Sequence, residues 1–245
     1  MIAAIILGRK GSVGFPDKNV TKVLGRPLSW YPMKAAMNCP EVDEVYLSTD
    51  DPRLTEIAYG LGVQTIERPA HLATSEALAE DAYLHAYQEI EARTGKEVEL
   101  LILLFCNAAT VSPEQMSEGI AALRKDPTLD SAITVSRYNM WSPLRARRIA
   151  EDGRVYPFVP FEAIGDPEQM NCDRDSQGDV WFADVALVVA RPRNLLDLEH
   201  GVLPQRWMGN RIHPIHNEAG FDLDYEWQIG QVEWWLKKHG WTAAD

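Results

Sequence analysis

The chain has 245 residues, of which 46% are hydrophobic and 24% charged, and it carries a formal net charge of −12. This acidic balance argues against a nucleic-acid-binding surface, because phosphate contacts need clustered lysine and arginine. The apolar run at residues 2–7 is too short to span a bilayer, and three widely separated cysteines suggest neither a disulfide framework nor a CxxC metal site, so we expect a cytoplasmic protein that binds no membrane.

Strand and helix patterns alternate along the first half of the chain. Nearly continuous apolar runs predict buried strands at residues 2–7, 44–48, 64–66, 100–105 and 131–135. Apolar residues at helical spacing predict helices at residues 28–38, 52–61, 76–93 and 112–125. Gly62 is expected to be a C-cap, and Ser112 an N-cap with Pro113 in the first turn. The alternation predicts an α/β fold, with a mainly parallel sheet covered by helices on both faces.

The pattern loosens between residues 137 and 177, where four prolines interrupt any periodicity. A short hairpin is predicted around residues 151–154. A strand follows at residues 179–190, and a helix at residues 225–239 closes the chain, with Trp227, Trp234 and Trp235 expected to pack in the core. We therefore predict a single domain, residues 1–245, with an insertion at residues 137–177.

A basic, glycine-rich stretch follows the first strand. Residues 1–26 carry five cations against one acid, a local charge of +4 that leaves −16 for the remainder. A loop at the carboxyl end of a strand can hold phosphate with its backbone amides and cationic side chains. However, the three glycines Gly8, Gly11 and Gly14 match neither the P-loop nor the dinucleotide-binding spacing. Spacing alone leaves phosphate binding and an ordinary strand-to-helix turn equally open.

The pattern Arg9-x-x-Ser12-x-Gly14-x-Pro16-x-Lys18-Asn19 resembles the opening motif of the CMP-sialic acid synthetases, or acylneuraminate cytidylyltransferases, which read R-x-G-S-K-G-(I/L/V)-P-x-K-N. The resemblance covers residues 1–90, weakens in the middle and returns near residue 222. It implies a Rossmann-like nucleotidyltransferase fold and transfer of CMP from CTP to an acidic sugar, a nonulosonic or related keto-acid sugar, with release of pyrophosphate. It also implies a homodimer, in which the insertion forms an arm that reaches the partner's active site.

The same resemblance implies the residues of the site. Catalytic roles fall to Arg9, Lys18 and Asp224, since arginine forms bidentate pairs with phosphate and lysine neutralises leaving-group charge. In the insertion, Arg145, Arg147 and Arg148 are either acceptor-binding residues or solvated surface cations. Nucleotide-binding roles fall to Leu7, Gly8, Arg9, Gly11, Ser12, Lys18, Asn19 and Arg68.

Asp222 and Asp224 are candidate ligands for Mg²⁺. Two carboxylates two residues apart in an extended chain point to the same side, and Mg²⁺ takes one or two carboxylates together with substrate phosphates. The family resemblance assigns the pair the same role. In isolation such acids are more often surface residues.

Other reactive side chains are expected to be structural. His213 and His216 have a spacing that could suit a metal, but Pro214 argues against a helical pair and no further ligand completes a tetrahedral set. Cys106 follows an apolar strand, and no motif supplies an activating base, so we expect a buried thiol.

The sequence departs from the family where the acceptor is expected to bind. Val13 stands where the family has lysine, and Lys10 is the candidate substitute. Residues 105–111 replace the usual L-Q-P-T-S-P-L-R, and the family's N-G-A is replaced around residues 183–185. The acceptor is therefore expected to differ from sialic acid itself. Two alternatives stay open: a related nucleotidyltransferase acting on a phosphonate or sugar phosphate, and a non-catalytic nucleotide-binding homologue; a dehydrogenase is disfavoured by the missing dinucleotide spacing.

Overall fold

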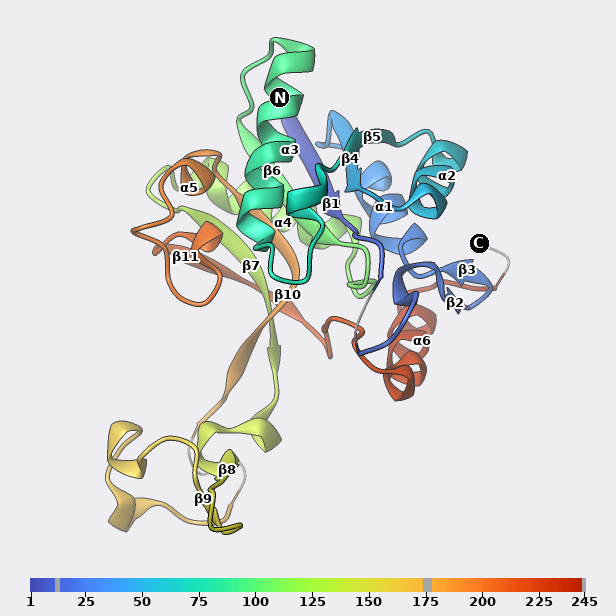
Figure 1. Cartoon of the computed structure of the whole chain (residues 1–245). Coiled ribbons are helices and arrows are strands. Elements are labelled where there is room, and N and C mark those ends of the chain that lie inside the picture. Colours follow the sequence, from blue (N-terminus) through green and yellow to red (C-terminus); the bar gives the residue numbers. More distant parts are fainter. Residues whose placement is uncertain (12–13, 174–177, 244–245) are drawn as a thin grey trace.

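The structure, a computed structural model, describes residues 1–11, 14–173 and 178–243. Its centre is a seven-stranded sheet in the order β11-β7-β10-β6-β1-β4-β5 (Figure 1). Strand β10 is antiparallel to β6 and β7, and every other pairing is parallel. The strands are β1 (Ile2–Leu7), β4 (Glu44–Thr49), β5 (Gln64–Glu67), β6 (Leu100–Phe105), β7 (Ser131–Arg137), β10 (Trp181–Ala190) and β11 (Ile212–Asn217).

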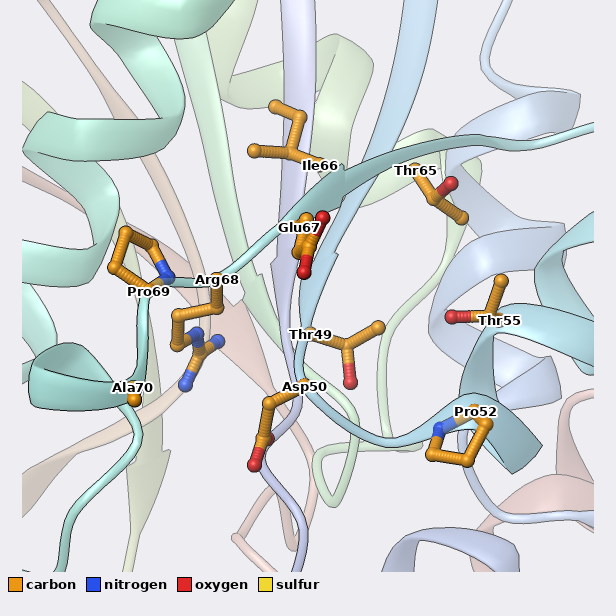
Figure 2. Close-up of a pocket in the computed structure, with 10 residues that line it drawn as sticks. All are labelled: Thr49, Asp50, Pro52, Thr55, Thr65, Ile66, Glu67, Arg68, Pro69 and Ala70. Carbon is orange, nitrogen blue, oxygen red and sulfur yellow. The ribbon is translucent and has the colours of Figure 1, made fainter.

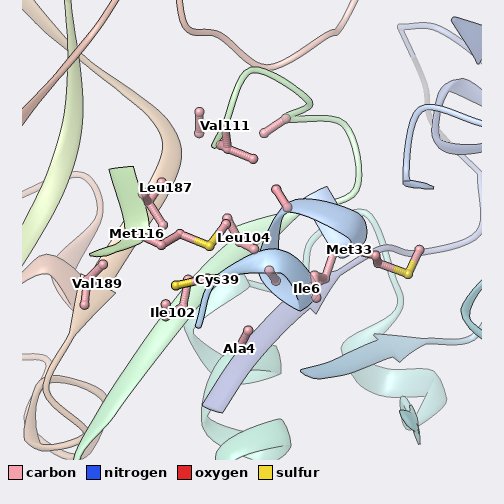
Figure 3. Close-up of a cluster of buried hydrophobic side chains, with 14 of the residues drawn as sticks. Ala4, Ile6, Met33, Cys39, Ile102, Leu104, Val111, Met116, Leu187 and Val189 are labelled. Carbon is pink, nitrogen blue, oxygen red and sulfur yellow. The ribbon is translucent and has the colours of Figure 1, made fainter. Parts of the chain in front are cut away.

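Helices cover both faces of this sheet, as the sequence predicts. Successive side chains of β1 point to opposite faces: Ile2, Ala4 and Ile6 join one core cluster, and the residues between them join another. The first cluster is closed by α1 (Trp30–Asn38), α2 (Pro52–Leu61) and α4 (Pro113–Lys125), with the side chains of Met33 and Met116 in it (Figure 3). The second is closed by α3 (Ala79–Thr94) and α5 (Arg193–Leu196).

Local capping explains where these helices begin and end. Asp51 caps α2 by accepting the backbone N–H of Arg53, and Gly62 ends it in the left-handed conformation at φ 78°. Ser112 caps α4 in a reciprocal capping box with Gln115. The helix predicted from residue 76 begins three residues later, at Ala79, because Thr74 Oγ1 accepts the backbone N–H of Ala77 in a turn instead.

Three strands are absent from the sequence prediction. Edge strand β11 contains Pro214, which an edge tolerates because one side of the strand has no partner. The short pair β2 (Lys22–Val23) and β3 (Arg26–Pro27) is joined by Leu24 and Gly25, both at positive φ.

A third core cluster holds the C-terminal helix α6 (Ile229–Lys238) against β2 and α1. Leu223 and Trp235 are fully buried in it. The expectation that three tryptophans pack in the core is right for Trp235 and wrong for Trp227 and Trp234, which are exposed. The buried residues of α6 are Val232, Trp235 and Leu236, which share one face of the helix, and Trp234 lies outside that face, on the surface beside the Lys238 ammonium.

Residues between β7 and β10 form an arm that projects from the sheet (Figure 1). It carries the predicted hairpin, β8 (Arg147–Ile149) and β9 (Val155–Pro157), turned at Gly153 with φ 74°. Its other turns are 3-10 helices at Asn139–Trp141, Pro143–Arg145, Phe161–Ala163 and Pro167–Gln169. No helix within the described ranges is long and apolar enough to cross a membrane.

Candidate functional site

The site lies where β1, β4 and β6 end together. Leu7 is paired with Ser48 on one side and Phe105 on the other, so the loops after all three strands leave the same edge. Gly8 then donates its backbone N–H to the Ser48 carbonyl at 3.1 Å. A Cβ on Gly8 would lie 2.5 Å from Cys106 Sγ, and only glycine fits this approach. The glycine therefore fixes the direction in which the basic, glycine-rich stretch after β1 leaves the sheet. We call this stretch the basic loop.

A cavity of about 180 Å³ opens at this edge. It brings together five of the predicted nucleotide-binding residues: Leu7, Arg9, Lys18, Asn19 and Arg68. Among the described residues that line it are three cations and no acidic side chain, which suits an anionic ligand. The other lining residues are Leu72, Ala77, Leu78, Ala79, Ala82, Phe105 and Asn107.

Asn19 contributes an unsatisfied acceptor to this cavity. Its Nδ2 donates to the Arg9 carbonyl at 3.4 Å, while its buried Oδ1 has no hydrogen-bond partner within the described part of the chain. An unpaired buried acceptor costs free energy, and a ligand that donates a hydrogen bond removes the cost. The atom is therefore an unsatisfied acceptor in a residue that lines the cavity.

Arg68 is buried at the end of β5, where it lines two neighbouring cavities. Its Nε donates to Ser48 Oγ at 3.2 Å and its Nη2 to the Ser48 carbonyl at 2.7 Å. Burial lowers the pKa of the guanidinium from its usual value. The second cavity, of about 790 Å³, lies between Arg68, Asp50 and the start of α2 (Figure 2). Arg68 is thus held by the backbone of β4 between the two cavities.

Lys18 connects the basic loop to the C-terminal acids. Its Nζ lies 2.5 Å from Asp224 Oδ1. The segment carrying Asp224 is fixed by Leu223, which is buried and makes two hydrogen bonds with Asn107. The Leu223 N–H donates to the Asn107 carbonyl at 3.0 Å, and the side-chain Nδ2 of Asn107 donates to the Leu223 carbonyl at 3.3 Å. Asn107 is a site residue that the sequence did not assign; its position after the end of β6 was the available signal.

Asp222 is a partly buried residue whose carboxyl group lacks a full set of partners. Its Oδ1 is inaccessible and accepts no hydrogen bond from any described residue. Burial, followed by the charge of Asp224, raises its pKa to about 7. A cation would satisfy this oxygen and lower that pKa, so the residues fit a metal ion with oxygen ligands.

The donor set favours Mg²⁺ over a cation held by protein ligands alone. Within the described residues there is no group of three or more histidine, cysteine, aspartate and glutamate side chains that could hold a metal. Mg²⁺ is commonly held by one or two carboxylates, with substrate phosphates and water completing its octahedron. Asp222 and Asp224 supply that minimum beside a cation-lined cavity.

Several other predicted residues fall elsewhere. Gly8 and Gly11 shape the loop without lining the cavity, and Gly11 has φ 73°. Ser12 and Val13 lie outside the described residues, so their predicted roles stay predictions. The backbone N–H of Lys10 donates to Asp50 Oδ1 at 2.7 Å, and its side chain is exposed.

The positions of Cys106 and of the two histidines agree with the expected structural roles. Burial raises the pKa of the Cys106 thiol to about 12, which keeps it protonated and disfavours its use as a nucleophile. His213 and His216 lie in β11, where positions three apart face opposite sides of the strand.

The arginines proposed for the acceptor lie in the arm, away from the end of β1 (Figure 1). Arg145 donates to the Cys172 carbonyl, and Arg147 donates to the carbonyls of Leu144 and Ala146. These two side chains therefore support the arm itself. Arg148 is exposed on β8.

Comparisons with known proteins agree with this geometry. Over 97% of its length the chain resembles a CMP-2-keto-3-deoxy-manno-octonic acid synthetase solved with CTP, with a TM-score of 0.68, 17% identity and 99% of that chain covered. It also resembles a 4-diphosphocytidyl-2C-methyl-D-erythritol synthase from Anaerococcus prevotii, with a TM-score of 0.61, 16% identity and 96% of each chain covered. These likenesses confirm the predicted nucleotidyltransferase fold.

Curated relatives share parts of the sequence. An N-acylneuraminate cytidylyltransferase from Oncorhynchus mykiss is 24% identical over 94% of this chain and 49% of its own length. A 3-deoxy-manno-octulosonate cytidylyltransferase from Nitratidesulfovibrio vulgaris is 40% identical over 27% of each chain. A Helicobacter pylori protein, a pseudaminic acid cytidylyltransferase joined to a hydrolase, is 24% identical over 58% of this chain and 27% of its own. The chain thus spans about half the length, or less, of these relatives.

The sequence profile of one protein family, described as cytidylyltransferase, matches residues 3–138. This range is more than half of the chain and contains the basic loop, Lys18, Arg68 and the end of β6. The chain therefore belongs to the cytidylyltransferase family.

Proposed function

We propose that the protein transfers CMP from CTP to a small anionic acceptor, an acidic sugar of the nonulosonic or related keto-acid class, and releases pyrophosphate. The observation that carries the proposal is the cavity at the end of β1, where Arg9, Lys18 and Arg68 meet the unsatisfied Oδ1 of Asn19. The family match adds the identity of the nucleotide.

The reaction is an in-line displacement at phosphorus. An acceptor hydroxyl oxygen forms a bond to the α-phosphorus of CTP, its proton passes to solvent, and the bond from that phosphorus to the bridging oxygen of pyrophosphate breaks. Arg9 and Lys18 would donate hydrogen bonds to phosphate oxygens and stabilise the charge that develops on the leaving group. Positioning and charge stabilisation supply most of the rate of such transfers.

Asp222 and Asp224 would hold Mg²⁺ together with phosphate oxygens. When bound, the ion neutralises phosphate charge and orients the triphosphate. Lys18 pairs with Asp224 in the structure, so nucleotide binding would exchange this partner for phosphate. The two acids and Lys18 therefore form one group of interacting charges.

The acceptor class rests on the relatives and on the arm. The names of the curated relatives mention N-acylneuraminate, 3-deoxy-manno-octulosonate and pseudaminic acid. The residues around 105–111 and 183–185 depart from the sialic acid enzymes, which favours a related acid over sialic acid itself. Arg148 is exposed on β8 and would serve an acceptor in a second subunit of a homodimer. Three free cysteines fit a reducing cytoplasm.

The test is pyrophosphate release with Mg²⁺, comparing CTP, UTP, GTP and ATP across a panel of acidic sugars, sugar phosphates and phosphonates. We expect turnover with CTP and an acidic sugar, and its loss in Asp222→Asn, which keeps the side-chain shape but removes the charge. Turnover with a different nucleotide or only with a phosphonate would redirect the assignment to a related nucleotidyltransferase. CTP binding without pyrophosphate from any acceptor would indicate a non-catalytic homologue.

A further inference from the structure

A buried polar cluster is in contact with the segment that carries Asp222. We call it the Asp184 cluster, and it consists of Thr134, Ser136, Asp184, Asn217 and Gly220. Asp184 accepts hydrogen bonds from the hydroxyl of Thr134, from Ser136 Oγ at 2.7 Å and from the backbone N–H of Ala186 at 3.1 Å. A buried carboxyl group with this many donors is held in one place.

The strand itself is distorted to place this carboxyl group. The register between β10 and β7 shifts between Ala183 and Val188, which marks a β-bulge. Within the bulge Val185 has φ 57°, a conformation that a β-branched residue rarely adopts. Such strain persists where the surrounding contacts determine the conformation, and it is concentrated at functional sites. The bulge therefore points to a role for Asp184 beyond filling the interior.

The cluster reaches the site through Gly220. The Gly220 N–H donates to Ser136 Oγ at 2.9 Å, so Ser136 bridges Asp184 and the segment two residues before Asp222. A Cβ on Gly220 would lie 2.3 Å from Asp184 Oδ2. Asn217 fixes the start of this segment, since its Nδ2 donates to the Thr110 carbonyl at 3.0 Å and its Oδ1 accepts from Trp235 Nε1 at 3.2 Å.

We propose that Asp184 is a positioning residue, which sets the place of the Asp222 carboxyl group through Ser136 and Gly220. The inference rests on the proposed function for the role of Asp222 toward Mg²⁺ and CTP. Asp184 would not contact the nucleotide. Its loss would let the segment before Asp222 relax and would weaken binding of the metal–nucleotide complex.

Asp130 offers a matched control at the opposite end of β11. It accepts the backbone N–H groups of Asn210 and Arg211 at 3.0 and 2.9 Å, and a Cβ on Gly209 would lie 2.4 Å from its Cβ. It thus anchors a glycine-containing segment much as the Asp184 cluster does, but it lies at the other end of the strand from Asp222. A purely structural effect should be shared by both acids.

The experiment compares Asp184→Asn, Ser136→Ala and Asp130→Asn in the full chain. Binding of Mn²⁺ in the presence of CTP is measured by electron paramagnetic resonance, alongside Tm and the Mg²⁺ dependence of pyrophosphate release. We expect the first two variants to weaken Mn²⁺ binding about tenfold, the usual size of an effect transmitted through the partner of a metal ligand. Saturating Mg²⁺ should restore most of kcat. Asp130→Asn should lower Tm and leave the Mn²⁺ affinity unchanged.

The outcomes separate the inference from the proposed function. If the wild-type protein binds Mn²⁺ with CTP and both cluster variants bind equally well, the inference is overturned and the proposed function stands. If Asp130→Asn weakens Mn²⁺ binding as much as the cluster variants do, the effect is general and the inference is also overturned. If the wild-type protein binds no Mn²⁺ with CTP, both fail. Should Asp184→Asn not fold, Ser136→Ala decides, because it removes only the bridging hydroxyl.

Discussion

Lys18 Nζ lies 2.5 Å from Asp224 Oδ1, although the two residues are 206 positions apart in the chain. The Lys18 side chain is 15% exposed and that of Asp224 is 56% exposed. Ion pairs with a partner this accessible contribute little to stability, because water and salt screen them. The pair therefore connects the basic loop to the acidic segment without holding the fold together.

Replacing Lys18 with methionine should separate function from stability. Lys18→Met keeps an unbranched side chain of similar length but removes the cation that would face the leaving group. We expect the rate of pyrophosphate release with CTP to fall by about 10²–10³, the usual cost of losing one donor to a developing anion. Tm should change by no more than about 2 °C, as expected when an exposed ion pair is lost.

Lys22→Met is the matched control, since Lys22 lies in β2 and is exposed outside the cavity. It should leave the rate unchanged. Equal rates for the Lys18 variant and the wild-type protein would remove Lys18 from the catalytic residues, while an equal loss in both variants would show a general dependence on local charge.

The sequence predicts the site better on the parallel side of the sheet than on the antiparallel side. The family resemblance assigned Arg9, Lys18 and Arg68 to one site, and the parallel strands account for their meeting, because the loops after such strands leave the sheet at one edge. Asp184 could not be assigned to the site from the sequence. Its side chain faces inward only because a bulge holds Val185 at positive φ, a conformation that a β-branched residue rarely adopts. Strand β11 was hidden by Pro214, and the contact of Asn107 with Leu223 joins segments more than a hundred residues apart.

Gly8 and Cys106 should show strong coupling in unfolding experiments. In Gly8→Ala the new Cβ would lie 2.5 Å from Cys106 Sγ and 2.7 Å from Leu54 Cδ1. We expect the free energy of unfolding to fall by about 1–3 kcal/mol through overpacking. Adding Cys106→Ala removes one of the two clashes, so the double variant should be more stable than the sum of the single effects by about 1 kcal/mol.

Urea unfolding of the four proteins in this cycle gives the coupling directly. Gly60→Ala is the control, because a Cβ on Gly60 meets nothing within 4 Å and the residue lies inside α2. It should stabilise the protein by about 0.5–1 kcal/mol. Strictly additive effects at positions 8 and 106 would show that the loop moves to accommodate the methyl group.

Asp51 should contribute a pH-dependent part of the stability. Its carboxyl group is buried and accepts hydrogen bonds from the Arg53 backbone N–H, Nε and Nη2, and the hydrogen bond from the guanidinium is the main cause that holds its pKa below the usual 3.8. Because the folded-state pKa is depressed, the stabilisation is present above about pH 4 and is lost as the pH falls through the folded-state value. Asp51→Asn keeps the N-cap oxygen but removes the charge.

The free energies of unfolding of Asp51→Asn and wild type should therefore differ by about 1–2 kcal/mol at pH 6 and converge toward pH 3. Asp17→Asn is a useful comparison, since Asp17 also accepts from Arg53 Nη2 but is more than half exposed. Its effect should be smaller at every pH. A difference for Asp51→Asn that stays constant from pH 6 to pH 3 would contradict the role of the charge.

The arm should hold two copies of the chain together. Ile149, in β8, and Phe158, which directly follows β9, are 79% and 66% exposed. An exposed apolar surface on a projecting segment is typical of an interface. We expect the wild-type protein to be a dimer and Ile149→Glu with Phe158→Glu to be a folded monomer, because two buried glutamates would lose hydration without gaining partners. Light scattering after size exclusion measures the mass, and circular dichroism checks the fold.

Tyr59→Glu is the control, because Tyr59 is an exposed aromatic residue of α2 in the body of the molecule, and this variant should leave the dimer intact. If the arm variant remains dimeric, the contact lies elsewhere, and Arg148 would lose its route to an acceptor in the second subunit.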